Sequence, residues 1–156
     1  MKIGLSVVVI MILAVIAWID HKTMEIPDTC NLAIGICGVL AMFVNPEISI
    51  YARMIGAVCI SVPMLIMIHL IPGSFGGGDV KLTFAAGLYL GFRLMLVGTF
   101  LAFMIGGCQA MILLVMGKAK VGDGVHMAFG PALCMGFAAA MLVGNELLSW
   151  YLNLFW

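Results

Sequence analysis

The stretch from Ile50 to Ile71, IYARMIGAVCISVPMLIMIHLI, decides the class of fold. It holds one arginine and one histidine among otherwise uncharged residues. A helix needs about 20 apolar residues to cross the hydrocarbon core of a bilayer, and this stretch is long enough. Comparable apolar runs lie on both sides of it. We therefore interpret the chain as a membrane protein.

The composition of the whole chain agrees with a membrane protein. Its 156 residues are 65% hydrophobic and 9% charged, whereas a soluble domain has about 25% charged residues. Seven basic and seven acidic side chains give no net charge, so there is no basic surface for nucleic acid. The five cysteines form no C-x-x-C pair, which gives no support for a zinc or redox site. We expect neither a metal nor a cofactor.

Six apolar segments are separated by short breaks that hold most of the charged residues and prolines. The fourth segment is too short to cross a bilayer alone, and we interpret it as a tilted or half-buried helix that merges with its neighbours. The tail from Asn145 ends in aromatic residues typical of a membrane interface. We predict one all-α polytopic membrane domain over residues 1–156, with about six transmembrane helices. The six segments are Ile3–Ile19, Thr29–Val44, Ile50–Ile71, Val80–Leu90, Leu94–Met116 and Ala128–Val143.

The basic residues in the breaks predict an orientation. If six spans alternate, the first, third and fifth breaks share one side of the membrane, and this side has four basic residues against three on the other. The positive-inside rule places the richer side in the cytoplasm. Asp20 and Asp79 lie on this same side whichever way the chain is oriented. The richer side holds Lys22, Lys81, Lys118 and Lys120, and the other holds Lys2, Arg53 and Arg93.

Two aspartates stand at the ends of apolar segments. Asp20 ends the first segment, and Asp79 follows Gly76, Gly77 and Gly78. An ionised carboxylate near hydrocarbon costs several kcal/mol, so it is normally paired, hydrated or functional. The glycine run lets a second chain approach the backbone closely. The two positions are therefore candidates for a functional pair.

Two carboxylates can hydrolyse a peptide bond without a metal or a covalent intermediate. One, ionised, takes a proton from water while the other, protonated, donates to the scissile carbonyl. Like charges about 3 Å apart cannot both ionise, so such a pair shares one proton and titrates as a unit. The pattern favours an intramembrane-type aspartyl peptidase.

Other interpretations of the acidic residues remain open. Asp20 can be an interfacial charge that stops translocation, and Asp79 can cap the helix that follows it. For Asp28, which precedes the second apolar segment, capping is the favoured interpretation. A small transporter or proton relay can use the same carboxylates, but the middle of each span is almost wholly apolar, which counts against it. In a structural assembly partner the acids would only position loops.

Three blocks of sequence resemble the type IV prepilin peptidase family and its relatives, the archaeal preflagellin peptidases. The first runs from Ile19-Asp20 to Ile26-Pro27-Asp28, and the second is GGGDVKL from Gly76 to Leu82, which contains the Gly-x-Gly-Asp signature. The third is AFGPAL from Ala128 to Leu133. Gly-x-Gly-Asp alone is a weak signal, but the three blocks in order are specific, and they cover roughly residues 15–140.

The resemblance implies an aspartic endopeptidase that removes the short basic leader of prepilin-like proteins at the cytoplasmic face of the inner membrane. Asp20 and Asp79 match the two catalytic positions. The expected partners are a prepilin-like substrate and the lipid bilayer, with no cofactor and no indication of an oligomeric state. Residues expected to bind substrate or support the site are Pro27, Asp28, Gly76, Gly77, Gly78, Lys81, Gly130 and Pro131.

One departure from the family narrows this expectation. The larger bacterial members carry a cytoplasmic insert with paired cysteines and also methylate the new N-terminus. The chain has neither such an insert nor a C-x-x-C pair. It is similar to the short, peptidase-only forms that serve tight-adherence (Flp) pili, archaeal-type filaments or a minor secretion system. We expect no methyltransferase domain and no methyl donor.

Overall fold

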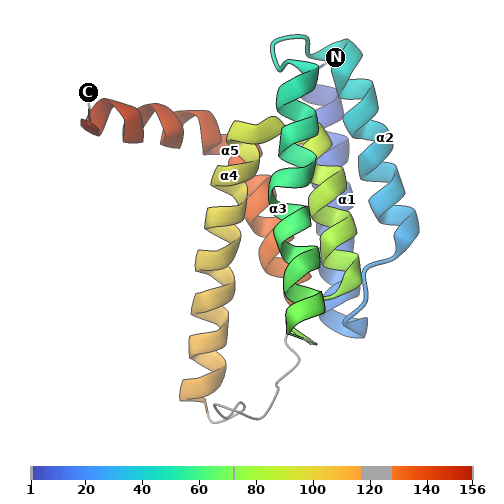
Figure 1. Ribbon diagram of the computed structural model, residues 1–156, viewed down its shortest axis with the longest axis vertical. Coiled ribbons are helices and arrows are strands. Elements are labelled where there is room, and N and C mark those ends of the chain that lie inside the picture. The colour runs from blue at the N-terminus through green and yellow to red at the C-terminus, as the bar shows by residue number, and fades with distance from the viewer. Residues whose placement is uncertain (1, 72, 117–127, 156) are drawn as a thin grey trace.

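The computed structural model describes residues 2–71, 73–116 and 128–155. Over these residues the chain forms helices and no strand, which confirms the predicted all-α class. Figure 1 shows the helices packed as a bundle, with most of their axes along its length. They are α1 (Lys2–Thr23), α2 (Asp28–Val44), α3 (Ile50–Leu70), α4 (Gly77–Val115) and α5 (Gly130–Phe155).

Four of the five helices in the described part of the chain, α1, α3, α4 and α5, are long and apolar enough to cross a membrane. The apolar helix α2, with 17 residues, is shorter. The expected count of about six spans is not confirmed, because only four of the described helices are long and apolar enough. The predicted segments Val80–Leu90 and Leu94–Met116 lie on either side of Gly91 in α4, and the second ends one residue beyond that helix. The tail from Asn145 is also part of a longer helix, since α5 continues to Phe155. Its last turns, red in Figure 1, project sideways from the bundle, roughly at right angles to most of the other helices.

Gly91 divides α4 into two arms. Its φ of 73° lies in the left-handed region, which glycine adopts without the strain that a Cβ atom causes. In Figure 1 the first arm runs beside α3 and the second, in gold, returns in the opposite direction. The second arm is antiparallel to α5, because Gly98 packs on Phe137 whereas Gly106 packs on Phe129. The predicted break is therefore a reversal of direction within α4.

Arg53 fastens the ends of two helices to α3. The side chain is fully buried, and its Nη1 donates to the carbonyls of Leu88 and Tyr89 at 3.0 and 2.8 Å. Its Nη2 donates to those of Ala41 and Asn45 at 3.1 and 3.0 Å. The last carbonyls of a helix have no partner within it and carry the negative end of its dipole, so a cation stabilises them. Arg53, which the predicted orientation counts among the basic residues at the membrane surface, is instead buried inside the bundle.

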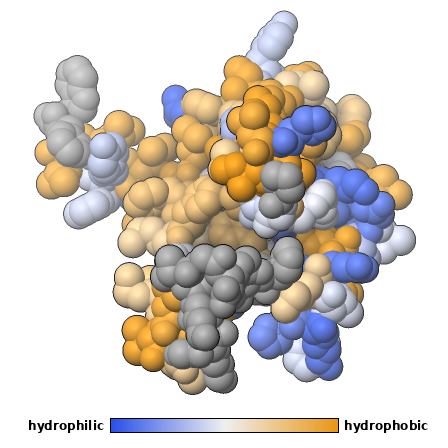
Figure 2. All heavy atoms as spheres, turned by 60° about the horizontal axis from the view of Figure 1, so that its bottom comes forward, coloured by the Kyte–Doolittle hydropathy of each residue, from blue (hydrophilic) through white to orange (hydrophobic). Residues whose placement is uncertain are grey.

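The outside of the bundle is largely apolar, as a lipid-facing surface should be. Large hydrophobic side chains such as Phe43 and Val115 are more than 80% exposed. Figure 2 looks toward the end of the bundle that is lowest in Figure 1, where hydrophilic residues gather on one side. Lys118 and Lys120, which carried part of the orientation argument, lie outside the described residues, so the orientation stays a prediction.

Candidate active site

A cleft of about 530 Å³ lies between the α1–α2 connection and the start of α4. Asp20 enters it from the last turn of α1, and Asp79 from the first turn of α4. The structure thus brings the two aspartates together with Pro27 and the glycine run, as the motifs predicted. The cleft is lined by Asp20, Met24, Glu25, Ile26, Pro27, Asp28, Gly76, Gly77, Gly78 and Asp79.

Asp20 is buried, with 4% of its surface exposed. Its Oδ2 has no hydrogen-bond partner among the described residues, and an unpaired buried carboxyl oxygen is costly. The backbone of Gly130 packs against it, so that a Cβ added there would lie 2.5 Å from Oδ2. Because α5 begins at Gly130, free N–H groups and the positive end of the helix dipole lie close to this carboxyl group. Pro131 follows in the first turn, where a missing N–H costs nothing.

Asp79 is also buried, with 7% of its surface exposed. Its Oδ2 accepts a hydrogen bond of 3.1 Å from the backbone N–H of Gly76, so Asp79 does cap α4. That bond involves only Oδ2, so the other carboxyl oxygen of Asp79 is not used by the cap and can take part in chemistry in the cleft. The glycine run is helical from Gly77 onward, not extended. A Cβ at Gly77 would meet open space, whereas one at Gly78 would lie 2.9 Å from Cβ of Ile26.

Asp28 does not cap α2, contrary to the favoured interpretation. The helix begins at Asp28 itself, with Pro27 in the N-cap position and no side-chain cap bond. Asp28 instead pairs with Lys81, whose Nζ lies 2.7 and 2.8 Å from its two oxygens. Both side chains are more than half exposed. This pair links the first turn of α2 to the first arm of α4 beside the cleft.

Asn31 is a residue that the sequence analysis missed. Its side chain is buried in α2, and its Nδ2 donates to the carbonyl of Gly78 at 3.5 Å, the long limit of a hydrogen bond. It therefore joins α2 to the glycine run. An amide within an apolar segment, one turn after Pro27, was the available signal.

Three aromatic rings hold the two acidic segments to the second arm of α4. The ring centroid of Phe129 lies 5.5 Å from that of Phe75 and 5.5 Å from that of Phe103. The centroids of Phe75 and Phe103 are 6.4 Å apart. Phe75 immediately precedes Gly76, which bonds to one aspartate, and Phe129 immediately precedes Gly130, which packs on the other. These rings are not among the site residues predicted from the motifs, which are glycines, prolines, acids and a lysine. The available signal was their position in the sequence, since Phe75 and Phe129 each directly precede a glycine of the acidic or glycine-proline motif.

Two buried carboxyl groups in one open cleft suit acid–base chemistry on a peptide bond, because none of the described residues that line the cleft is a basic one that would neutralise them. In the part of the chain that the structure describes, no group of three or more His, Cys, Asp or Glu residues is arranged to hold a metal ion.

Comparison with known proteins gives consistent findings. A family model described as the type IV leader peptidase family matches residues 7–111, which include both aspartates. The chain is 26% identical over 149 residues to the prepilin leader peptidase/N-methyltransferase of Bacillus subtilis (strain 168), a match that covers 96% of the chain and 59% of that protein. The protein of the same name from Legionella pneumophila is 25% identical over 95% of the chain and 53% of its own length. The one from Neisseria gonorrhoeae is 30% identical over 76% of the chain and 41% of its own length.

The chain thus spans about half the length of these curated relatives. No solved structure matches it.

Proposed function

The chain belongs to the type IV leader peptidase family, and on this premise we propose that it is an aspartic endopeptidase that removes the leader of prepilin-like proteins. The relatives it resembles are named as prepilin leader peptidases. Asp20 and Asp79 are the proposed catalytic pair, and the substrate is a membrane-anchored protein with a short basic leader.

The observation that carries this proposal is the convergence of two buried carboxyl groups on one cleft. They come from segments far apart in the sequence, at the end of α1 and the start of α4. A carboxyl group that serves only as an interfacial charge gains nothing from burial, since desolvation is unfavourable for a charged group. The open space at Gly77 leaves room for a substrate backbone beside Asp79.

The chemistry follows from one shared proton. The ionised carboxylate removes a proton from a water molecule, which attacks the scissile carbonyl carbon, while the protonated carboxyl group donates its proton to the carbonyl oxygen. When the tetrahedral intermediate collapses, the carboxyl group that took the proton of the water gives it to the departing amine. The other carboxylate takes back a proton from the hydroxyl that becomes the new carbonyl oxygen, so the pair returns to its starting state. Because two interacting carboxyl groups titrate as a unit, the roles of acid and base belong to the pair.

Two finer features belong to the same proposal. Cleavage takes place at the cytoplasmic face of the inner membrane, which is supported by the excess of basic residues in the breaks beside the aspartates. The mature N-terminus is left unmethylated, which is supported by the lack of a C-x-x-C pair in these 156 residues. The mass of the mature substrate tests the second feature, because methylation replaces a hydrogen atom by a methyl group and so adds the mass of one CH2 unit.

Co-expression with a candidate prepilin tests the main proposal. Asp20→Asn and Asp79→Asn keep the size of each side chain but remove its ability to ionise. Each should slow leader removal by about 100- to 10,000-fold, the usual contribution of a positioned acid or base. The matched control is Glu146→Gln in α5, an exposed acid away from the cleft, which should cleave at the normal rate. Full processing by either aspartate variant removes that residue from the catalytic pair.

A further inference from the structure

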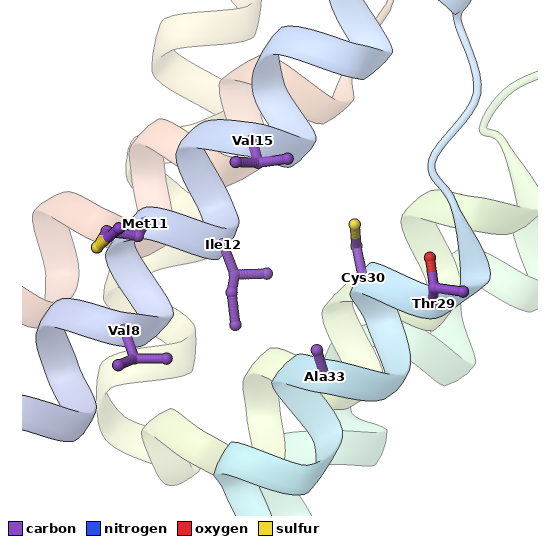
Figure 3. A pocket seen from close by; sticks show the side chains of 7 residues that line it. All are labelled: Val8, Met11, Ile12, Val15, Thr29, Cys30 and Ala33. Carbon is purple, nitrogen blue, oxygen red and sulfur yellow. The ribbon is translucent and has the colours of Figure 1, made fainter.

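An apolar groove of about 470 Å³ separates α1 from α2 and opens toward the lipid. Figure 3 shows Ile12 and Val15 on one wall and Cys30 and Ala33 on the other, with their side chains directed into the space between the helices. Val15 is half exposed in spite of this position. The groove is lined by Val8, Met11, Ile12, Val15, Thr29, Cys30 and Ala33.

The side chains on the two walls of the groove suit the packing of a third helix between α1 and α2. Val8, Met11, Ile12 and Val15 follow the i, i+3, i+4, i+7 spacing, which places them in one stripe along α1. The wall on α2 has only short side chains, among them Ala33. Association of helices in a membrane depends on close packing against small residues, because burial of apolar surface from lipid gives no driving force.

The groove and the candidate active site are lined by neighbouring residues of α2. Asp28 lines the cleft, and the next two residues of α2, Thr29 and Cys30, line the groove. Among the described residues, the cleft lining includes four acidic side chains and no basic one, and one of the four, Asp28, is paired with Lys81 beside the cleft. An apolar groove thus lies beside a cleft that is rich in acidic side chains. A matching ligand has an apolar helix joined directly to a positively charged extended segment.

We propose that the α1–α2 groove binds the apolar helix of the substrate and delivers the junction that precedes this helix to Asp20 and Asp79. The inference rests on the proposed peptidase function and adds to it the surface that recognises the membrane part of the substrate. Thr29 lies at the end of the groove nearest the cleft, where the polar part of the substrate begins.

Cross-linking gives the first test. The full chain, with benzoylphenylalanine in place of Val15, is reconstituted in phosphatidylcholine vesicles with a probe that carries a basic leader, the cleavage junction and about 20 apolar residues. Irradiation should join the two proteins. The control carries the same group in place of Leu142, a lipid-exposed residue of α5 that does not line the groove, and should give no such product.

Filling the groove gives the second test. Ala33→Trp occupies it and should raise the KM for this probe about tenfold, which corresponds to about 1.4 kcal/mol of lost binding. The matched control is Val39→Trp on the lipid-exposed surface of the same helix, which does not line the groove and should leave KM unchanged. A short peptide with the leader and junction but without the apolar helix should be cleaved equally by wild type and both variants, which also shows that Ala33→Trp folds.

The results of these tests distinguish a failure of the groove proposal from a failure of the proposed peptidase function. If wild type cleaves neither probe, the proposed function fails. If wild type cleaves the membrane probe while Ala33→Trp has a normal KM and the Val15 position cross-links only to lipid, the groove is a lipid site and the inference is overturned. A KM raised equally by both tryptophan variants also overturns it.

Discussion

The backbone of Gly130 lies directly against the carboxyl group of Asp20. A Cβ at Gly130 would be 2.5 Å from Asp20 Oδ2 and 2.7 Å from its Cγ, distances that atoms of this kind do not adopt. The first turn of α5 is therefore a wall of the site, and glycine at its first position sets how closely this wall approaches the aspartate.

Replacement of Gly130 by alanine should displace the Asp20 carboxyl group or the start of α5. A misplacement of about 1 Å in an active site can cost on the order of 100-fold, so we expect a loss of that size in kcat/KM with a folded protein. The measurement is the rate of leader removal by purified enzyme.

Gly107→Ala is the matched control, because a Cβ at Gly107 would meet nothing within 4 Å. It should keep full activity and gain up to about 1 kcal/mol of helix propensity. Equal rates for the two alanine variants would contradict the view that Gly130 positions Asp20.

The aromatic cluster predicts a coupled effect on catalysis. Phe75→Leu and Phe129→Leu should each lower kcat about tenfold with little change in KM, since the loss of an aromatic contact of about 1 kcal/mol loosens the segments next to the aspartates. The double variant should raise the activation free energy by less than the sum of the two single variants, because the rings of Phe75 and Phe129 contact each other. Steady-state kinetics on the four proteins measure this, with the exposed Phe43→Leu as control. Strict additivity would show that the rings act separately.

The sequence predicted what depends on local pattern and on family motifs. Apolar runs located the helices, and the motifs predicted that Asp20 and Asp79 share one end of the bundle. The break predicted between Leu90 and Leu94 is where α4 turns back on itself, but the sequence did not show that Gly91 alone, in a left-handed conformation, makes this turn within one helix. The capping role expected of Asp28 failed for a related reason, since its pairing with Lys81 depends on a helix 53 residues away. Tertiary contacts decided both cases.

The pair of Asp28 and Lys81 should contribute little to stability in spite of its short distances. Both side chains are more than half exposed, and such pairs contribute at most about 1 kcal/mol. A double-mutant cycle with Asp28→Asn and Lys81→Met, followed by thermal unfolding in detergent, should give a coupling free energy within this limit, and it should fall as salt is added. A coupling above about 2 kcal/mol that salt does not change would contradict the exposure of the pair.

Arg53 should be far more important for stability than any other basic residue whose side chain the structure describes. Replacement by methionine leaves four carbonyl groups at two helix ends without their charged donor, and each hydrogen bond to a charged group contributes about 1.5–3 kcal/mol. Because water and neighbouring groups replace some of these bonds, we expect a net loss of about 3 kcal/mol. Arg53→Lys should give a loss of stability smaller than that of Arg53→Met. The ammonium group keeps the charge, but its single nitrogen cannot donate to all four carbonyl groups, which the two nitrogens of the guanidinium group reach.

The measurement for Arg53 is unfolding in mixed micelles with increasing dodecyl sulfate, followed by loss of helical circular dichroism. Arg93→Met is the matched control, because Arg93 is exposed and surface substitutions usually change stability by less than about 0.5 kcal/mol. If Arg53→Met unfolds at the same dodecyl sulfate fraction as Arg93→Met, the four bonds do not hold α2 and the first arm of α4 to α3. If it unfolds earlier while the folded fraction still cleaves the leader at the normal rate, Arg53 acts on the fold alone, as its place at the end of the bundle opposite the cleft requires.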